Sequence, residues 1–149
     1  MNTNPRTNKL SDGLMVGVLL TLIAAFIYLP FVFQFGYYFD DWYIMFAAGA
    51  RGVEAIREIY SIDRPAGALL MSPLYTLFGA NPLFYNLSAF VFRVASALGV
   101  WILCVRMWPR ARSVAFITAL LYLIYPGFLS QPNGITYQYY LAGLASAIW

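Results

Sequence analysis

The sequence has no histidine, a single cysteine and few charged residues. Without histidine there is no imidazole to act as a general base, a general acid or a metal ligand. Cys104 alone can form neither a disulfide within the chain nor a thiolate zinc site. The net charge is only +3 and no basic patch is interleaved with aromatic residues, so nucleic acid is not a favoured partner.

Apolar and aromatic residues dominate instead, at 62% and 19% of the 149 residues. Charged residues make up 10%, against about 25% in soluble domains. Too few charged side chains are present to cover a soluble particle, so the excess apolar surface must face lipid or a large partner. We therefore expect an integral membrane protein of the all-α class, built as a polytopic transmembrane helix bundle.

Long runs with little or no charge predict where the spans lie. The first, Leu14 to Phe35, would extend about 33 Å as a helix, which is enough to cross a bilayer core. It is too long for the apolar region of a signal peptide and ends in aromatic residues. Further spans are expected at about 83–106, 113–130 and 135–149. Because the last stops short of the ~20 residues that a span needs, we interpret residues 1–149 as the N-terminal part of one transmembrane domain.

The basic residues predict the orientation of these spans. Lys and Arg gather in cytoplasmic loops, and arginines cluster at 106–112. The apolar stretch Ala66–Phe78 is short and contains Pro73, which is typical of an interfacial or re-entrant segment. If it does not cross, the N-terminus and the arginine cluster are cytoplasmic and the loop 36–82 is outside. We favour this topology, in the plasma membrane (the inner membrane of a bacterium); if the stretch crosses, the cluster lies outside.

The outer loop 36–82 predicts two short interfacial helices. Within it, Tyr43, Phe46, Ala47 and Ala50 fall on one helical face, although this segment is apolar nearly all round. The second segment has a cleaner apolar face and an opposite charged face, formed respectively by Val53, Ile56 and Tyr60 and by Glu54, Arg57 and Glu58. Such helices suit the outer membrane surface.

Asp40 and Asp41 stand where the first of these helices should begin. One interpretation is an N-cap, because Asp accepts hydrogen bonds from the N–H groups of a first turn. The other is a proton acceptor or metal ligand, because crowded carboxylates perturb each other's pKa. Spacing alone leaves both open.

Five short motifs follow one another in a distinctive order. They are Tyr38-Phe39-Asp40-Asp41-Trp42, Asp63-Arg64-Pro65, Leu77-Phe78-Gly79-Ala80-Asn81, Arg106-Met107-Trp108-Pro109-Arg110 and Tyr125-Pro126-Gly127-Phe128-Leu129. This order resembles the GT-C class of membrane glycosyltransferases. It is similar to the branch that contains protein O-mannosyltransferases and lipid A aminoarabinose transferases.

Three positions depart from that pattern. Arg64 stands where the family usually has Lys, and an arginine usual near position 86 is matched only by Arg93, two helical turns later. The acidic residue common at the start of the fourth span is replaced around Thr136-Tyr137-Gln138.

The resemblance implies an enzyme that moves a sugar from a polyprenyl phosphate to a glycan, lipid or protein acceptor on the outer face of the membrane. Asp40 would then be the catalytic base, and Asp41 would orient it or stabilise a cation. Arg64 and Arg93 would bind the donor phosphate. Asp63 would hold Arg64 or ligate a divalent metal, a cofactor that the sequence leaves undecided.

Two other functions stay open on the residues. A membrane transporter subunit would use polar groups within broken spans, and Arg93 and Pro126-Gly127 are of that kind. In a non-catalytic membrane assembly protein, Asp40 and Asp41 would only be helix caps.

Overall fold

The computed structural model describes residues 5–125, 134–135 and 138–148, with their side chains except those of residues 5–11, 63 and 139. Every regular element among these residues is a helix, which confirms the all-α expectation for this part of the chain. The elements are α1 (Pro5–Tyr28), the 3-10 helix η1 (Leu29–Phe31), α2 (Asp40–Arg51), α3 (Val53–Asp63), α4 (Pro65–Phe78), α5 (Pro82–Met107), α6 (Arg112–Leu123) and α7 (Gln138–Ile148).

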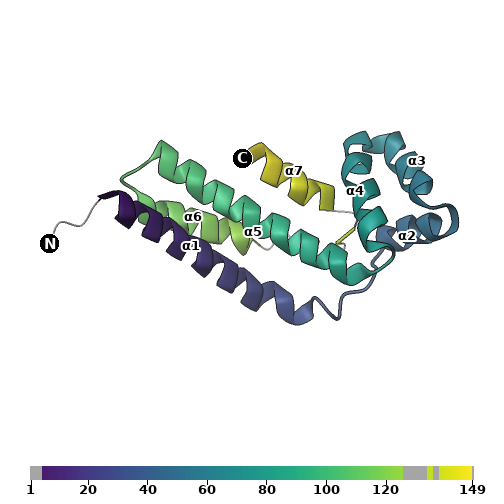
Figure 1. Cartoon of the computed structure of the whole chain (residues 1–149), viewed down its shortest axis with the longest axis horizontal. Helices are drawn as coiled ribbons and strands as arrows, with labels where there is room; N and C mark the ends of the chain where they lie inside the picture. Colours follow the sequence, from purple (N-terminus) through teal and green to yellow (C-terminus); the bar gives the residue numbers. More distant parts are fainter. Residues whose placement is uncertain (1–4, 126–133, 136–137, 149) are drawn as a thin grey trace.

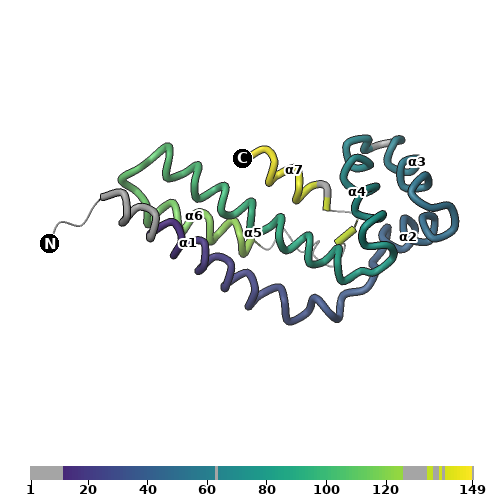
Figure 2. Tube along the Cα trace, viewed as in Figure 1, coloured from purple at the N-terminus to yellow at the C-terminus, as the bar shows by residue number. Residues whose placement is uncertain are grey.

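Helix α5 runs along the long axis of the molecule and contacts α1, α4, α6 and α7 (Figure 1). Helices α2, α3 and α4 gather at one end, and we call these three helices the cap. The start of α1 and the turn from α5 to α6 lie at the opposite end (Figure 1). Residues 32–39 lead from α1 and η1 into the cap, as the trace in Figure 2 shows. The predicted loop 36–82 therefore forms a helical unit of its own.

Two helical segments are long and apolar enough to cross a membrane, Asp12–Phe31 and Pro82–Met107. The second agrees with the predicted span 83–106. The first ends four residues before the predicted limit of 35, because α1 stops at Tyr28, two residues before Pro30, and only η1 continues it.

The other two predicted spans correspond to shorter helices. For the span predicted at 113–130, the structure shows α6 ending at Leu123, and residues 126–133 lie outside the described part. Within the span predicted at 135–149, the structure has the helix α7, which covers Gln138–Ile148. The stretch Ala66–Phe78 lies entirely in α4, a shorter apolar helix of the cap.

Small residues let the long helices approach closely. The buried core of the bundle joins α1, α5 and α6 through Ala24, Ala97 and Ala119, flanked by Leu20 and Leu123. Alanine at helix contacts allows the backbones to come near each other, which is the usual packing of helices in lipid. The bundle is thus held by close van der Waals contact along α5.

The cap has its own buried core, to which α2 contributes Ile44, Met45 and Ala48. The predicted faces of α3 are confirmed, because Ile56 and Tyr60 are buried and Glu54, Arg57 and Glu58 are exposed. On α2 the predicted face points outward, with Tyr43 64% and Phe46 78% exposed. Because this helix is apolar nearly all round, periodicity could not tell its inner side from its outer side.

The contact of α3 with α4 depends on Gly67. A Cβ atom built there would lie 2.6 Å from the Tyr60 ring, which is itself buried. We expect Gly67→Ala to lower the free energy of unfolding by about 1–3 kcal/mol, as overpacked cores do. Gly49 is the matched control, because a Cβ there meets nothing within 4 Å. Gly49→Ala should be neutral or stabilise by up to about 1 kcal/mol through helix propensity. Unfolding in detergent micelles measures both, and equal stabilities would contradict this packing.

Candidate functional site

Asp40 and Asp41 occupy the first turn of α2 but do not cap it. The N-cap residue is Phe39, and no side-chain hydrogen bond caps this helix. The two carboxylates have different surroundings: Asp40 is exposed, whereas Asp41 is only 1% exposed. Successive positions on a helix point about 100° apart, so one carboxylate can face outward while its neighbour faces the cap core.

Asp40 also differs from the other exposed acids. Glu54 pairs with Arg57, Glu58 with Arg51 and Asp12 with Arg112, at 2.6, 2.6 and 2.7 Å respectively. Asp40 makes no ion pair with any residue that the structure describes. Its carboxylate is therefore accessible and not neutralised by a described arginine.

The backbone directly before the pair is strained. Phe39 has φ 46° and ψ −117°, and it is the one described residue other than glycine with positive φ. A bulky side chain in such a region costs on the order of 1–3 kcal/mol. Strain of this kind often accompanies functional sites, and here it fixes the direction in which Asp40 and Asp41 leave the loop.

Tyr37 links the start of α2 to the turn before α5. Its hydroxyl donates a hydrogen bond to the carbonyl of Ala80, and its ring packs edge-on against Trp42 with centroids 5.2 Å apart. Burial raises the pKa of Tyr37, and the nearby Tyr75 and Asp41 raise it further. Tyr37 therefore stays a neutral donor beside the buried Asp41 carboxylate.

Tyr85, in the first turn of α5, lies beneath this group. It is fully buried, donates to the carbonyl of Gly79 at 2.9 Å and packs edge-on against Phe78. Tyr60 and Tyr75 lie close to it, so tyrosines from three helices and the loop gather around the base of the cap. Sequence reasoning missed this cluster, because tyrosines scattered between positions 37 and 85 carry no local spacing signal.

A buried amide stands where the resemblance predicts an acid. Gln138 at the start of α7 is fully buried and hydrogen-bonds with Ser88 of α5. Thr136 and Tyr137 lie outside the described residues. Close by, Asn86 donates to the carbonyl of Phe35 at 3.3 Å. The sole signal for Gln138 in the sequence is that it is a polar residue in an apolar run.

Arg64 sits at the junction of α3 and α4, where it ends the first helix and precedes the second. Its N–H donates to the Tyr60 carbonyl at 2.8 Å, and its own carbonyl accepts from Gly67 at 2.7 Å. The side chain is half-buried. Asp63 is the last residue of α3, and its side chain is not described. Among the described side chains, no three of His, Cys, Asp or Glu gather as metal ligands.

Arg93 lies deeper in the bundle than the other predicted site residues. It is 3% exposed, and its guanidinium stands 4.2 Å from the ring centroid of Tyr28. Ser96 and Tyr122 are its neighbours. At 1.5 Å per residue, Arg93 is about 12 Å along α5 from Tyr85. Of the two predicted phosphate ligands, only Arg64 belongs to the cap.

Comparison with protein-family models, curated proteins and solved structures found no match. Function is therefore inferred from the chemistry of the cap. An accessible carboxylate, a buried carboxylate beside a neutral phenol, and a half-buried guanidinium on the same small unit can accept a proton, orient a hydroxyl and bind an anion.

Proposed function

We propose that the chain is part of a membrane glycosyltransferase that moves a sugar from a polyprenyl phosphate to an acceptor on the outer face of the membrane. The observation that carries this proposal is the state of Asp40. Its carboxylate is exposed, does not cap α2 and pairs with no described arginine. A general base must be accessible and unneutralised in this way to take a proton from an acceptor.

The reaction needs a base for the acceptor, a leaving group on the sugar, and a positive charge that stabilises the departing phosphate. The bond between the sugar C1 and the donor phosphate oxygen breaks, and its electron pair stays with the polyprenyl phosphate. The acceptor oxygen forms the new bond to C1 while Asp40 takes its proton. Asp41, buried near Tyr37, would orient Asp40 at this end of α2. Arg64 offers a planar fork of N–H donors to the departing phosphate.

We assign phosphate binding to Arg64 rather than to Arg93. The guanidinium of Arg93 is stacked on Tyr28 within the bundle, which is a stabilising cation–π contact. Arg64 lies at the edge of the cap, next to the apolar helix α4. A prenyl phosphate presents its charge at the depth of the headgroups, with its chain in lipid.

We further propose that the cap lies outside and the N-terminus in the cytoplasm. In support, the connection between α5 and α6, which carries Arg106 and Arg110, shares one end of the molecule with the start of α1, and the cap stands at the other end (Figure 1). Cytoplasmic loops carry the excess of Lys and Arg.

The topology can be tested by cysteine labelling in a Cys104→Ala background. Ser61→Cys on α3 and Pro109→Cys in the α5–α6 turn place thiols at exposed positions. An impermeant maleimide should label residue 61 from the outside of intact cells, and residue 109 only after the membrane is opened. Labelling of both positions from one side would overturn this orientation.

The role of Asp40 can be tested with Asp40→Asn, which keeps the size of the side chain. Sugar transfer from a polyprenyl-phosphate donor, measured with the protein in membranes, should fall by about 10²–10⁴-fold, the usual contribution of a general base. The protein should accumulate as wild type does, because no side-chain cap is lost.

Glu54→Gln is the matched control for Asp40→Asn. Glu54 is an exposed acid in the first turn of the adjacent helix α3, and its ion pair with Arg57 is of the surface type worth about 0–1 kcal/mol. This variant should keep full activity. An active Asp40→Asn protein would contradict the proposal and favour the transporter or assembly alternatives.

The role of Arg64 can be tested by donor dependence. Arg64→Ala should raise the donor-lipid concentration needed for half-maximal rate by at least about tenfold, because a charge-assisted contact to phosphate is lost. Arg64→Lys should retain part of the activity as a point charge. Arg57→Ala, which removes an exposed arginine of the same unit, should leave donor use unchanged. Equal donor dependence in both alanine variants would remove Arg64 from the phosphate site.

A further inference from the structure

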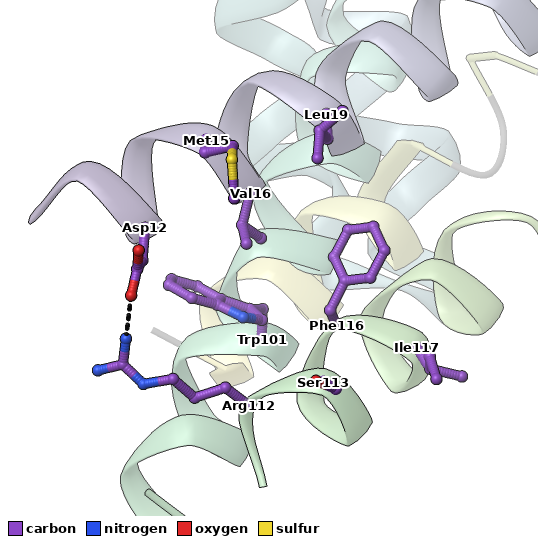
Figure 3. A pocket seen from close by; sticks show the side chains of 9 residues that line it. All are labelled: Asp12, Met15, Val16, Leu19, Trp101, Arg112, Ser113, Phe116 and Ile117. Carbon is purple, nitrogen blue, oxygen red and sulfur yellow. Dashed lines mark hydrogen bonds and ion pairs between the residues drawn. The ribbon is translucent and has the colours of Figure 1, made fainter. Parts of the chain in front are cut away.

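A pocket opens between α1, α5 and α6 at the end of the molecule opposite the cap. Its volume is about 340 Å³, within the range of small-molecule sites. Figure 3 shows Trp101 and Phe116 projecting into the space between α1 and α6. Met15 and Leu19 of α1 line it as well, and both are exposed on the outer side of the helix. The pocket is thus a largely apolar groove that opens on the exposed surface of the bundle.

One end of this pocket is charged. The Nη1 group of Arg112 contacts the Oδ2 atom of Asp12 at 2.7 Å, and the side chains are 38% and 49% exposed (Figure 3). A guanidinium has five N–H donors, so this contact leaves Arg112 with further donor groups. Arg106 and Arg110 are exposed in the same turn. The described side chains at this end include three guanidiniums and one carboxylate, that of Asp12, which contacts Arg112 alone, so positive charge is in excess.

From this charge and shape we infer that the pocket binds an anionic phospholipid. The phosphate would contact Arg112, and one acyl chain would lie along Met15, Leu19 and Phe116. Basic pockets between membrane helices on the cytoplasmic side bind anionic headgroups in this way. The inference rests on the membrane placement and orientation proposed above, and not on sugar transfer.

A second cavity nearby provides an internal comparison. It has a volume of about 390 Å³, lies between α5 and α6, and is lined by Cys104, Trp108, Val114 and Thr118 among others. None of its lining residues is charged. It should accept acyl chains without regard to the headgroup. Since Trp101 lines the first pocket and Trp108 the second, tryptophan fluorescence can report on each separately.

The experiment uses the protein in bilayer nanodiscs with three of the four tryptophans of this chain replaced by Phe. The variant that retains Trp101 is compared in phosphatidylcholine discs that contain either brominated phosphatidylglycerol or brominated phosphatidylcholine as the quencher. We expect brominated phosphatidylglycerol to reach half-maximal quenching at about one-fifth of the mole fraction, because one arginine at the membrane surface favours anionic lipid about fivefold. Raising the salt concentration should reduce this preference.

Three variants make the test specific. Arg112→Gln should abolish the preference seen at Trp101, whereas Arg112→Lys should keep most of it, because a point charge still attracts phosphate. Arg57→Gln, in the cap, should change nothing. In the variant that retains Trp108, Arg112→Gln should leave quenching unaltered. Circular dichroism and the Tm establish that each variant is folded.

Equal quenching of Trp101 by the two brominated lipids in the unmutated pocket would overturn the inference, since it would show a groove filled by any acyl chain. A preference that survives Arg112→Gln would overturn it too. Loss of sugar transfer in Asp40→Asn is independent of both outcomes, so failure of the glycosyltransferase proposal and failure of the lipid site can be told apart.

Discussion

Close packing along α5 is the contact on which the rest of this molecule depends. The chain has too few charges to be held together by ion pairs, and the buried core that joins α1, α5 and α6 is entirely apolar. What remains is van der Waals contact at short range, which alanine permits at positions 24, 97 and 119. Trp101 adds to this packing, because its ring lies at ordinary van der Waals distance, 3.5 Å, from the place where a Cβ of Gly13 would be. The direction of α5 therefore fixes where α1 and α6 stand.

The cap is attached to this axis through the first turn of α5. Tyr85 is part of the buried cap core and bonds to the carbonyl of Gly79, while Tyr37 bonds to the next carbonyl, that of Ala80. These two phenols tie the loop before α2 and the turn after α4 to one helix. Asp41 is buried near Tyr37, so these hydrogen bonds of neutral side chains lie close to the acidic pair at the start of α2.

The sequence predicts the features that depend on composition and on a clear period. These features are the all-α class, the second long helix, the buried and exposed faces of α3, and the short apolar segment in α4. The inner side of α2 could not be predicted, because its apolar residues surround it. For the same reason nothing local distinguishes Asp41 from Asp40. Their difference in burial arises because Asp41 shares with Ile44, Met45 and Ala48 the side of α2 that packs against α3.

The charged residues of the cap differ in their surroundings. Arg51 and Arg57 pair with glutamates of α3 at exposed positions, where such contacts contribute little free energy and are screened by salt. Arg64 is different, because it is half-buried and its backbone joins two helices. Asp40 is different as well, because the strained residue Phe39 holds it at the start of α2 without giving it a capping bond. The strain at Phe39 costs stability, and residues held in this way often mark functional sites. An exposed carboxylate directly after a strained residue is the physical reason to test this end of the chain for chemistry.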